Sequence, residues 1–161
     1  WLHAHPGTNL RMTGMSAVLG RIQLDRLPEW HAIRQRNAQL LAQAFADCPL
    51  LRTPMPKPGL THAWYRFYTY VNPEMLAEGW SRDRIMTDIQ AAGFPVFSGS
   101  CPEIYLEAAF PEATKPQNPL PVSRELGETS LAFLVDPTWS EKEIKALLHA
   151  ALPILNAACR S

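Results

Sequence analysis

Asn9 and Arg11 are the residues whose types and spacing best suit the binding of a ligand. They lie two positions apart in the run from Gly7 to Thr13, directly before a segment with helical periodicity. In an extended backbone, residues two apart point to the same side, so an amide donor and a guanidinium would converge on one anion. A phosphate suits the fork of arginine donors well. On spacing alone, a turn asparagine beside a solvated arginine is the simpler interpretation.

The rest of the chain offers few reactive groups. Residues 98–103 form a small-residue loop after an expected strand, a place where loops often contact ligands. The loop lacks the second glycine of a G-x-S-x-G nucleophile elbow, and Cys101 has no base nearby in the sequence. The histidines lack metal-ligand spacing, and the lysines lie in proline loops or at an exposed helix start, which are not the desolvated surroundings that a Schiff-base lysine needs. The residues predict an anion-binding corner, but no metal site and no complete catalytic set.

The composition limits the classes of protein to which this chain can belong. The chain has 161 residues, 47% of them hydrophobic, which is enough for one domain with its own core. Fifteen basic and 15 acidic residues give a net charge of zero, so we expect no nucleic-acid partner. No apolar run approaches the roughly 20 residues of a membrane span, and no signal peptide is recognisable, so we expect a cytoplasmic protein without membrane contact. Because the chain begins at Trp1 and not at methionine, we expect it to be part of a longer protein.

Helices and strands should alternate after an initial helical pair. Thr13 can cap a first helix that ends near Leu27, and Pro28 can open a second helix that ends near Cys48. The proline-rich residues 52–61 should form an extended loop. The remaining pattern predicts strands over 63–71, 95–97 and 130–135, and helices from Ser81, over 121–126, and from the capping box Ser140–Glu143. These elements indicate an α/β fold class, as an α+β layered small domain whose sheet is covered by helices.

The run from Gly7 to Leu24 resembles a known signature. It matches every stated position of G-x-N-x-R-M-(S/T)-x-x-x-A-x-x-G-x-x-Q-L, which is typical of the DegT/StrS sugar aminotransferases. The likeness continues through residues 34–38, 62–64, 102–105 and 120–121. It implies the C-terminal part of a fold type I enzyme that depends on pyridoxal phosphate, with residues 1–27 as an interdomain helix carrying the N-x-R motif and residues 28–161 as the C-terminal small domain.

The resemblance also implies an activity and partners. Such enzymes transfer an amino group from an amino acid, usually glutamate, to a nucleotide-linked keto-sugar, for polysaccharide or glycoside biosynthesis. They are homodimers with active sites at the subunit interface, where Asn9 and Arg11 would reach the pyridoxal phosphate of the neighbouring subunit. The lysine that holds the cofactor belongs to the large N-terminal domain of the family, so the 161-residue chain by itself is expected to be inactive.

The loop before Tyr105 keeps only part of the family pattern. Pro102 and Tyr105 match P-L-H-x-x-P-x-Y, while its histidine is missing. We therefore expect Ser100 and Tyr105 to be the candidate substrate contacts on this loop.

Two alternatives stay open from the sequence. Some relatives with an altered lysine dehydrate sugars, and the deciding residue would lie upstream of this chain. A stand-alone domain that binds a partner protein and catalyses nothing would also fit. The upstream sequence distinguishes all three hypotheses.

Overall fold

A small antiparallel sheet lies at the centre of the computed structural model, which describes residues 11–99, 102–108, 110, 112 and 115–160. Its four strands are β1 (Leu51–Arg52), β2 (Phe67–Val71), β3 (Val96–Phe97) and β4 (Ser130–Phe133), in the order β1-β2-β4-β3. The longest pairing joins β2 to β4, from Phe67 opposite Phe133 to Tyr70 opposite Ser130. The predicted layered α/β domain is confirmed, and every strand pair in the described residues is antiparallel.

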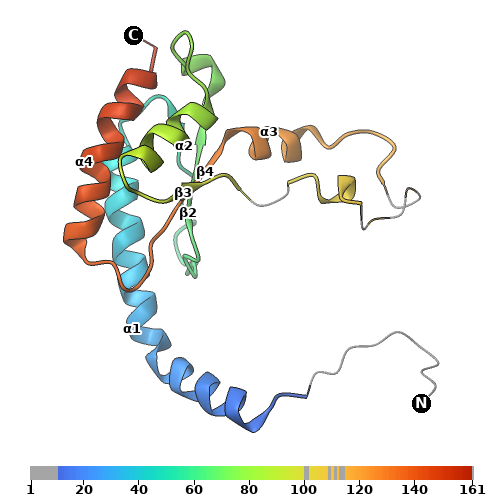
Figure 1. The fold of residues 1–161 in the computed structure, drawn as a ribbon, viewed down its shortest axis with the longest axis vertical. Helices are drawn as coiled ribbons and strands as arrows, with labels where there is room; N and C mark the ends of the chain where they lie inside the picture. The colour runs from blue at the N-terminus through green and yellow to red at the C-terminus, as the bar shows by residue number, and fades with distance from the viewer. Residues whose placement is uncertain (1–10, 100–101, 109, 111, 113–114, 161) are drawn as a thin grey trace.

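Helices cover one face of this sheet. Figure 1 shows α1 (Gly14–Phe45), α2 (Arg82–Ala91) and α4 (Glu141–Ala158) on one side of the strands, while α3 (Pro121–Thr129) projects from the other side. Two short 3-10 turns, at Pro73–Met75 and Ile104–Leu106, complete the described elements. Within the described residues, no helix combines the length and the apolar character needed to cross a membrane.

The core lies between the helices and the inner face of the sheet. Phe45 of α1 meets the rings of Phe67 and Phe133 at centroid distances of 6.2 and 5.3 Å. Burying each of these side chains stabilises the fold by about 1.5–3 kcal/mol. The other large, fully buried side chains of the helices are Leu41, Ile85, Ile89, Ile144, Leu147 and Leu155.

Residues 14–45 form one helix, so the prediction of two separate helices around Pro28 is wrong. Proline at an interior position loses its bond to the carbonyl of Leu24 and costs about 3 kcal/mol, which bends a helix without necessarily ending it. All the buried residues of α1 lie after this point, between Asn37 and Phe45. The N-terminal half extends away from the body of the domain (Figure 1). The domain boundary after residue 27 stays a prediction, and α1 runs through it.

Short-range signals located the other elements well. Ser81 caps α2 by accepting the Arg84 N–H, Gly93 after that helix has φ 92°, and Ser140 and Glu143 form the capping box of α4. Two expectations need correction. Arg52 pairs in β1 and is not in the loop, and the strand expected from residue 63 begins only at Phe67, because Trp64 has a positive φ of 48° that interrupts an extended backbone.

Candidate functional site

The N-terminal end of α1 carries one of the two predicted anion ligands. Thr13 caps the helix, and its hydroxyl oxygen accepts the Ser16 N–H at 3.2 Å. Arg11 lies two residues before this cap and is exposed, and the first turn contains no acidic residue. Main-chain N–H groups, a guanidinium and the positive end of a helix form a donor set that fits a phosphate. Asn9 lies outside the described residues.

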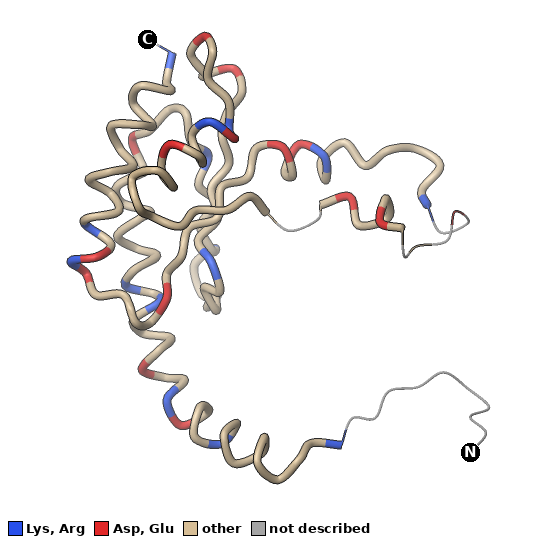
Figure 2. The backbone as a smooth tube through the Cα atoms, viewed as in Figure 1, with Lys and Arg blue, Asp and Glu red and all other residues tan. Residues whose placement is uncertain are grey.

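Beyond the N-terminal end of α1, basic and acidic residues are mixed along the described part of the chain. In Figure 2, Lys and Arg are interspersed with Asp and Glu along the described part of the chain. Attraction of an anion therefore depends on individual arginines, such as Arg11, and not on a broad basic patch.

The same half of α1 exposes many apolar side chains. They range from 48% exposed for Ile22 to 79% exposed for Met15, and they are Met15, Val18, Leu19, Ile22, Leu24 and Leu27. Met12, just before the helix, is 67% exposed. An exposed group of this extent on a helix marks an interaction surface.

Tyr105, a candidate substrate contact, is held by a local network. Its hydroxyl donates to Glu103 Oε1 at 2.6 Å and accepts the Leu120 N–H at 3.2 Å, and Arg124 pairs with Glu103 Oε2 at 3.3 Å. The hydrogen bond from Tyr105, followed by Arg124, holds the pKa of Glu103 below its usual value. The Tyr105 hydroxyl therefore joins its loop to the beginning of α3 and keeps one acceptor lone pair for a ligand.

Arg11 and Tyr105, the two predicted site residues that the structure describes, do not form one cluster within a single chain. In Figure 1 the N-terminal end of α1 and the turn Ile104–Leu106 belong to separate projections of the domain. Ser100, the other predicted substrate contact, lies outside the described residues.

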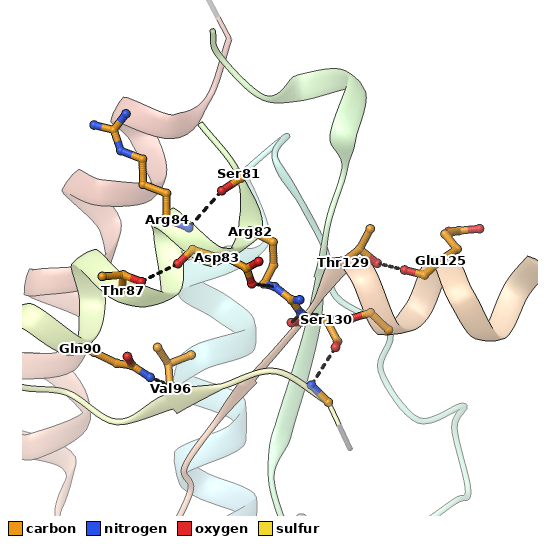
Figure 3. A network of polar contacts seen from close by, with 12 residues as sticks. Ser81, Arg82, Asp83, Arg84, Thr87, Gln90, Val96, Glu125, Thr129 and Ser130 are labelled. Carbon is orange, nitrogen blue, oxygen red and sulfur yellow. Dashed lines mark hydrogen bonds and ion pairs between the residues drawn. The ribbon is translucent and has the colours of Figure 1, made fainter. Parts of the chain in front are cut away.

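The polar network in Figure 3 was missed by sequence reasoning. It holds the beginning of the loop 98–105, called the substrate loop because it carries the candidate substrate contacts Ser100 and Tyr105. Ser130 Oγ accepts the Gly99 N–H at 2.8 Å, and Arg82 donates to the carbonyls of Gly127 and Ser130 at 3.1 and 2.9 Å. A Cβ at Gly127 would lie 2.1 Å from Pro102 Cγ, so only glycine lets the loop approach α3 this closely. A glycine inside a helix was the one local signal of this contact.

A second network joins α1 to the chain before β2. Arg34 donates to the carbonyls of Trp64 and Tyr65 at 3.0 and 3.2 Å, and Gln35 accepts the Trp64 indole N–H. His31 Nε2 lies 2.8 Å from the His62 carbonyl oxygen, so both histidines serve structure here. No group of residues that could hold a metal ion occurs in the described part of the chain.

Solved structures identify the class of fold. An aminotransferase from Psychrobacter cryohalolentis is 47% identical with a TM-score of 0.88, over 98% of this chain and 42% of that one. A Streptococcus pneumoniae protein described as a sugar aminotransferase, solved in PLP and PMP forms, is 19% identical with a TM-score of 0.78 in its PLP form, over 98% of this chain and 39% of that one. The chain has the fold of the corresponding part of fold type I aminotransferases that depend on pyridoxal phosphate.

Sequence comparison then identifies the family. Residues 1–151 match the DegT/DnrJ/EryC1/StrS aminotransferase family, to which this chain belongs. The erythromycin biosynthesis sensory transduction protein EryC1 of Saccharopolyspora erythraea is 24% identical over 142 residues, which are 88% of this chain and 37% of that protein. Pyridoxal phosphate is the cofactor of the family. The chain spans about two-fifths of the length of these relatives.

Proposed function

We propose that this chain forms the C-terminal part of an aminotransferase that moves an amino group from an amino acid, glutamate in the leading case, to a keto-sugar carried by a nucleotide. The product would serve polysaccharide or glycoside biosynthesis in the cytoplasm. The observation that carries the proposal is the family match over residues 1–151, together with 47% identity to the Psychrobacter aminotransferase.

Pyridoxal phosphate, when bound, supplies the electron sink for the amino transfer. Arg11 and Asn9 of this chain bind the phosphate of the cofactor in the neighbouring subunit of a homodimer. The capped N-terminus of α1 begins directly after Thr13, two residues from Arg11, and its N–H groups add positive potential beside the phosphate. The role of Arg11 and Asn9 is binding and orientation, which keeps the reacting atoms in register.

The lysine that holds the cofactor comes from a part of the enzyme outside this chain. Lys145 pairs with Glu141 and Lys115 with Glu112, both at 2.6 Å. Both amines are thus engaged in ion pairs with carboxylates of this chain. In this proposal the 161-residue chain is inactive by itself, because the cofactor lysine lies outside it, and it contributes the phosphate ligands and the substrate loop that carries Ser100 and Tyr105.

The test compares Arg11→Ala with Asn9→Ala in the complete enzyme. A charged donor to a phosphate contributes about 1.5–3 kcal/mol and a neutral donor about 0.5–1.5 kcal/mol, so Arg11→Ala should weaken cofactor binding more. Arg26→Ala, on the exposed part of α1, is the matched control and should leave binding unchanged.

Hybrid dimers test the position of Arg11 across the interface. Subunits with Arg11→Ala are mixed with subunits that lack the catalytic lysine. One site of each hybrid then combines an intact lysine from the first chain with Arg11 from the second. Activity above both parent homodimers is expected, and its absence in folded hybrids would show that Arg11 does not act on the neighbouring subunit.

A further inference from the structure

The outer sheet face, defined here as Arg66, Tyr68 and Tyr70, is the side of the sheet opposite α1 and α4, and α2 borders it through Met86 and Gln90. In β2, Phe67, Thr69 and Val71 are buried while Tyr68 and Tyr70 are half-buried, as expected for side chains that alternate across a strand. Arg66, directly before the strand, is half-buried as well. Three adjacent hollows of about 510, 330 and 150 Å³ lie along this face. Tyr68 lines all three of them, so the hollows form one continuous surface.

Arg66 places a positive charge at the largest hollow. Its guanidinium lies 4.5 Å from the ring centroid of Phe97 and 5.5 Å from that of Tyr65. No carboxylate in the described ranges pairs with it, whereas Arg52 at the far end of the face pairs with Glu125 at 3.9 Å. A guanidinium that is held over aromatic rings and lacks a counter-ion is suited to bind an anionic group.

The aromatic rings around Arg66 suit a planar ligand. Tyr65 is 73% exposed and Phe97 is 37% exposed, and both line the 510 Å³ hollow with Tyr68. Aromatic side chains of this kind stack on nucleobases with little regard to base identity. The volume is within the usual range of small-molecule sites.

The largest hollow is continuous with the predicted substrate loop. Ser98 and Gly99 line it, and they directly precede Ser100. Gly99 is held in place by Ser130 Oγ, so this edge of the hollow has a defined position. A ligand in the hollow could therefore extend to the loop that carries Ser100 and Tyr105.

We propose that the hollow at Arg66 binds the nucleoside diphosphate part of the sugar substrate, with the diphosphate on Arg66 and the base against Tyr65 and Tyr68. The proposal rests on the function proposed above, because it takes the nucleotide-linked sugar as substrate. It assigns a substrate-binding role to residues outside both the N-x-R motif and the loop 98–105.

The test uses the complete enzyme and the free diphosphates UDP and dTDP as probes, measured by isothermal titration. Arg66→Met should weaken binding of the better probe by about tenfold, because one charge-assisted contact to phosphate is lost. It should raise KM for the nucleotide-linked sugar and leave the half-reaction with the amino acid unchanged. Arg52→Met, on the same sheet face but paired with Glu125, is the matched control and should bind both probes as the wild type does.

A second variant protects the test against misfolding of the first. Tyr65→Ala removes an exposed ring and should weaken probe binding without a change in thermal stability. Unchanged probe binding in both Arg66→Met and Tyr65→Ala overturns the proposal. Burial of the outer sheet face beneath another part of the complete enzyme also overturns it. Those results leave the proposed function intact if the wild type aminates nucleotide-linked sugars, whereas a wild type without that activity would overturn the proposed function itself.

Discussion

Replacement of Arg82 by methionine should destabilise the domain more than any other surface-charge change near the substrate loop. The Arg82 side chain is only 16% exposed and donates to the carbonyls of Gly127 and Ser130, at the C-terminal end of α3. Carbonyls at a helix C-terminus have no partner within the helix, so Arg82 satisfies groups that methionine would leave unpaired.

The size of the effect follows from these two bonds. A hydrogen bond to a charged donor contributes about 1.5–3 kcal/mol, and the wild type offsets part of this by desolvating the guanidinium, so we expect a loss of about 2–4 kcal/mol. The pair with Asp83 adds little, because the Asp83 side chain is 72% exposed. Against a total stability of about 5–15 kcal/mol, this loss is large.

Urea unfolding followed by circular dichroism measures the loss. Arg26 is an exposed arginine on α1, and Arg26→Met serves as the control. This variant should change the free energy of unfolding by less than about 0.5 kcal/mol. Amide hydrogen exchange at Gly99 should also accelerate in Arg82→Met, because the Ser130 hydroxyl that accepts this N–H loses its fixed position. If Arg82→Met unfolds at the same urea concentration as Arg26→Met and Gly99 exchange is unchanged, the network does not hold the substrate loop.

Three further predictions concern α3, the pH dependence of stability and the exposed half of α1. Gly127→Ala should destabilise the domain, because crowding against Pro102, about 1–3 kcal/mol, exceeds the gain of about 1 kcal/mol in helix propensity. In a Pro102→Ala background, Gly127→Ala should instead stabilise the domain. Thermal unfolding of the double mutant against Pro102→Ala alone shows whether the effect of Gly127→Ala changes from destabilising to stabilising. The backbone N–H and hydroxyl of Thr138 lower the pKa of Asp136, so its contribution to stability is present above the unfolded pKa and is lost as the pH falls through the lower folded pKa. Asp136→Asn should therefore reduce the dependence of stability on acid pH, and an unchanged urea midpoint-versus-pH curve would argue against this role. The 161-residue chain should self-associate or bind a hydrophobic dye through α1, and Ile22→Lys should reduce both effects in sedimentation and dye assays, whereas a monodisperse wild type without dye binding would count against this surface.

Local signals in the sequence identified most of the elements, because each depends on residues only a few positions apart. The Ser140–Glu143 capping box and the Ser81 cap act within one helical turn, and their helices begin where predicted. Pro28 shows the limit of such reasoning. The sequence shows that a hydrogen bond is lost at this position but not that the flanking turns remain one helix.

The sequence by itself also determined the family, through the N-x-R run, and the candidate phosphate ligands Asn9 and Arg11. The remaining site depends on contacts between distant residues. Arg82 bonds to Ser130, 48 positions later, and Ser130 to Gly99, 31 positions earlier, and no periodicity carries information over that range. Strand alternation places Tyr68 and Tyr70 on one side of β2, but only the packing of α1 and α4 against the other side decides that this side is left half-buried. Tertiary structure decides these points because burial and hydrogen bonding depend on which surfaces meet.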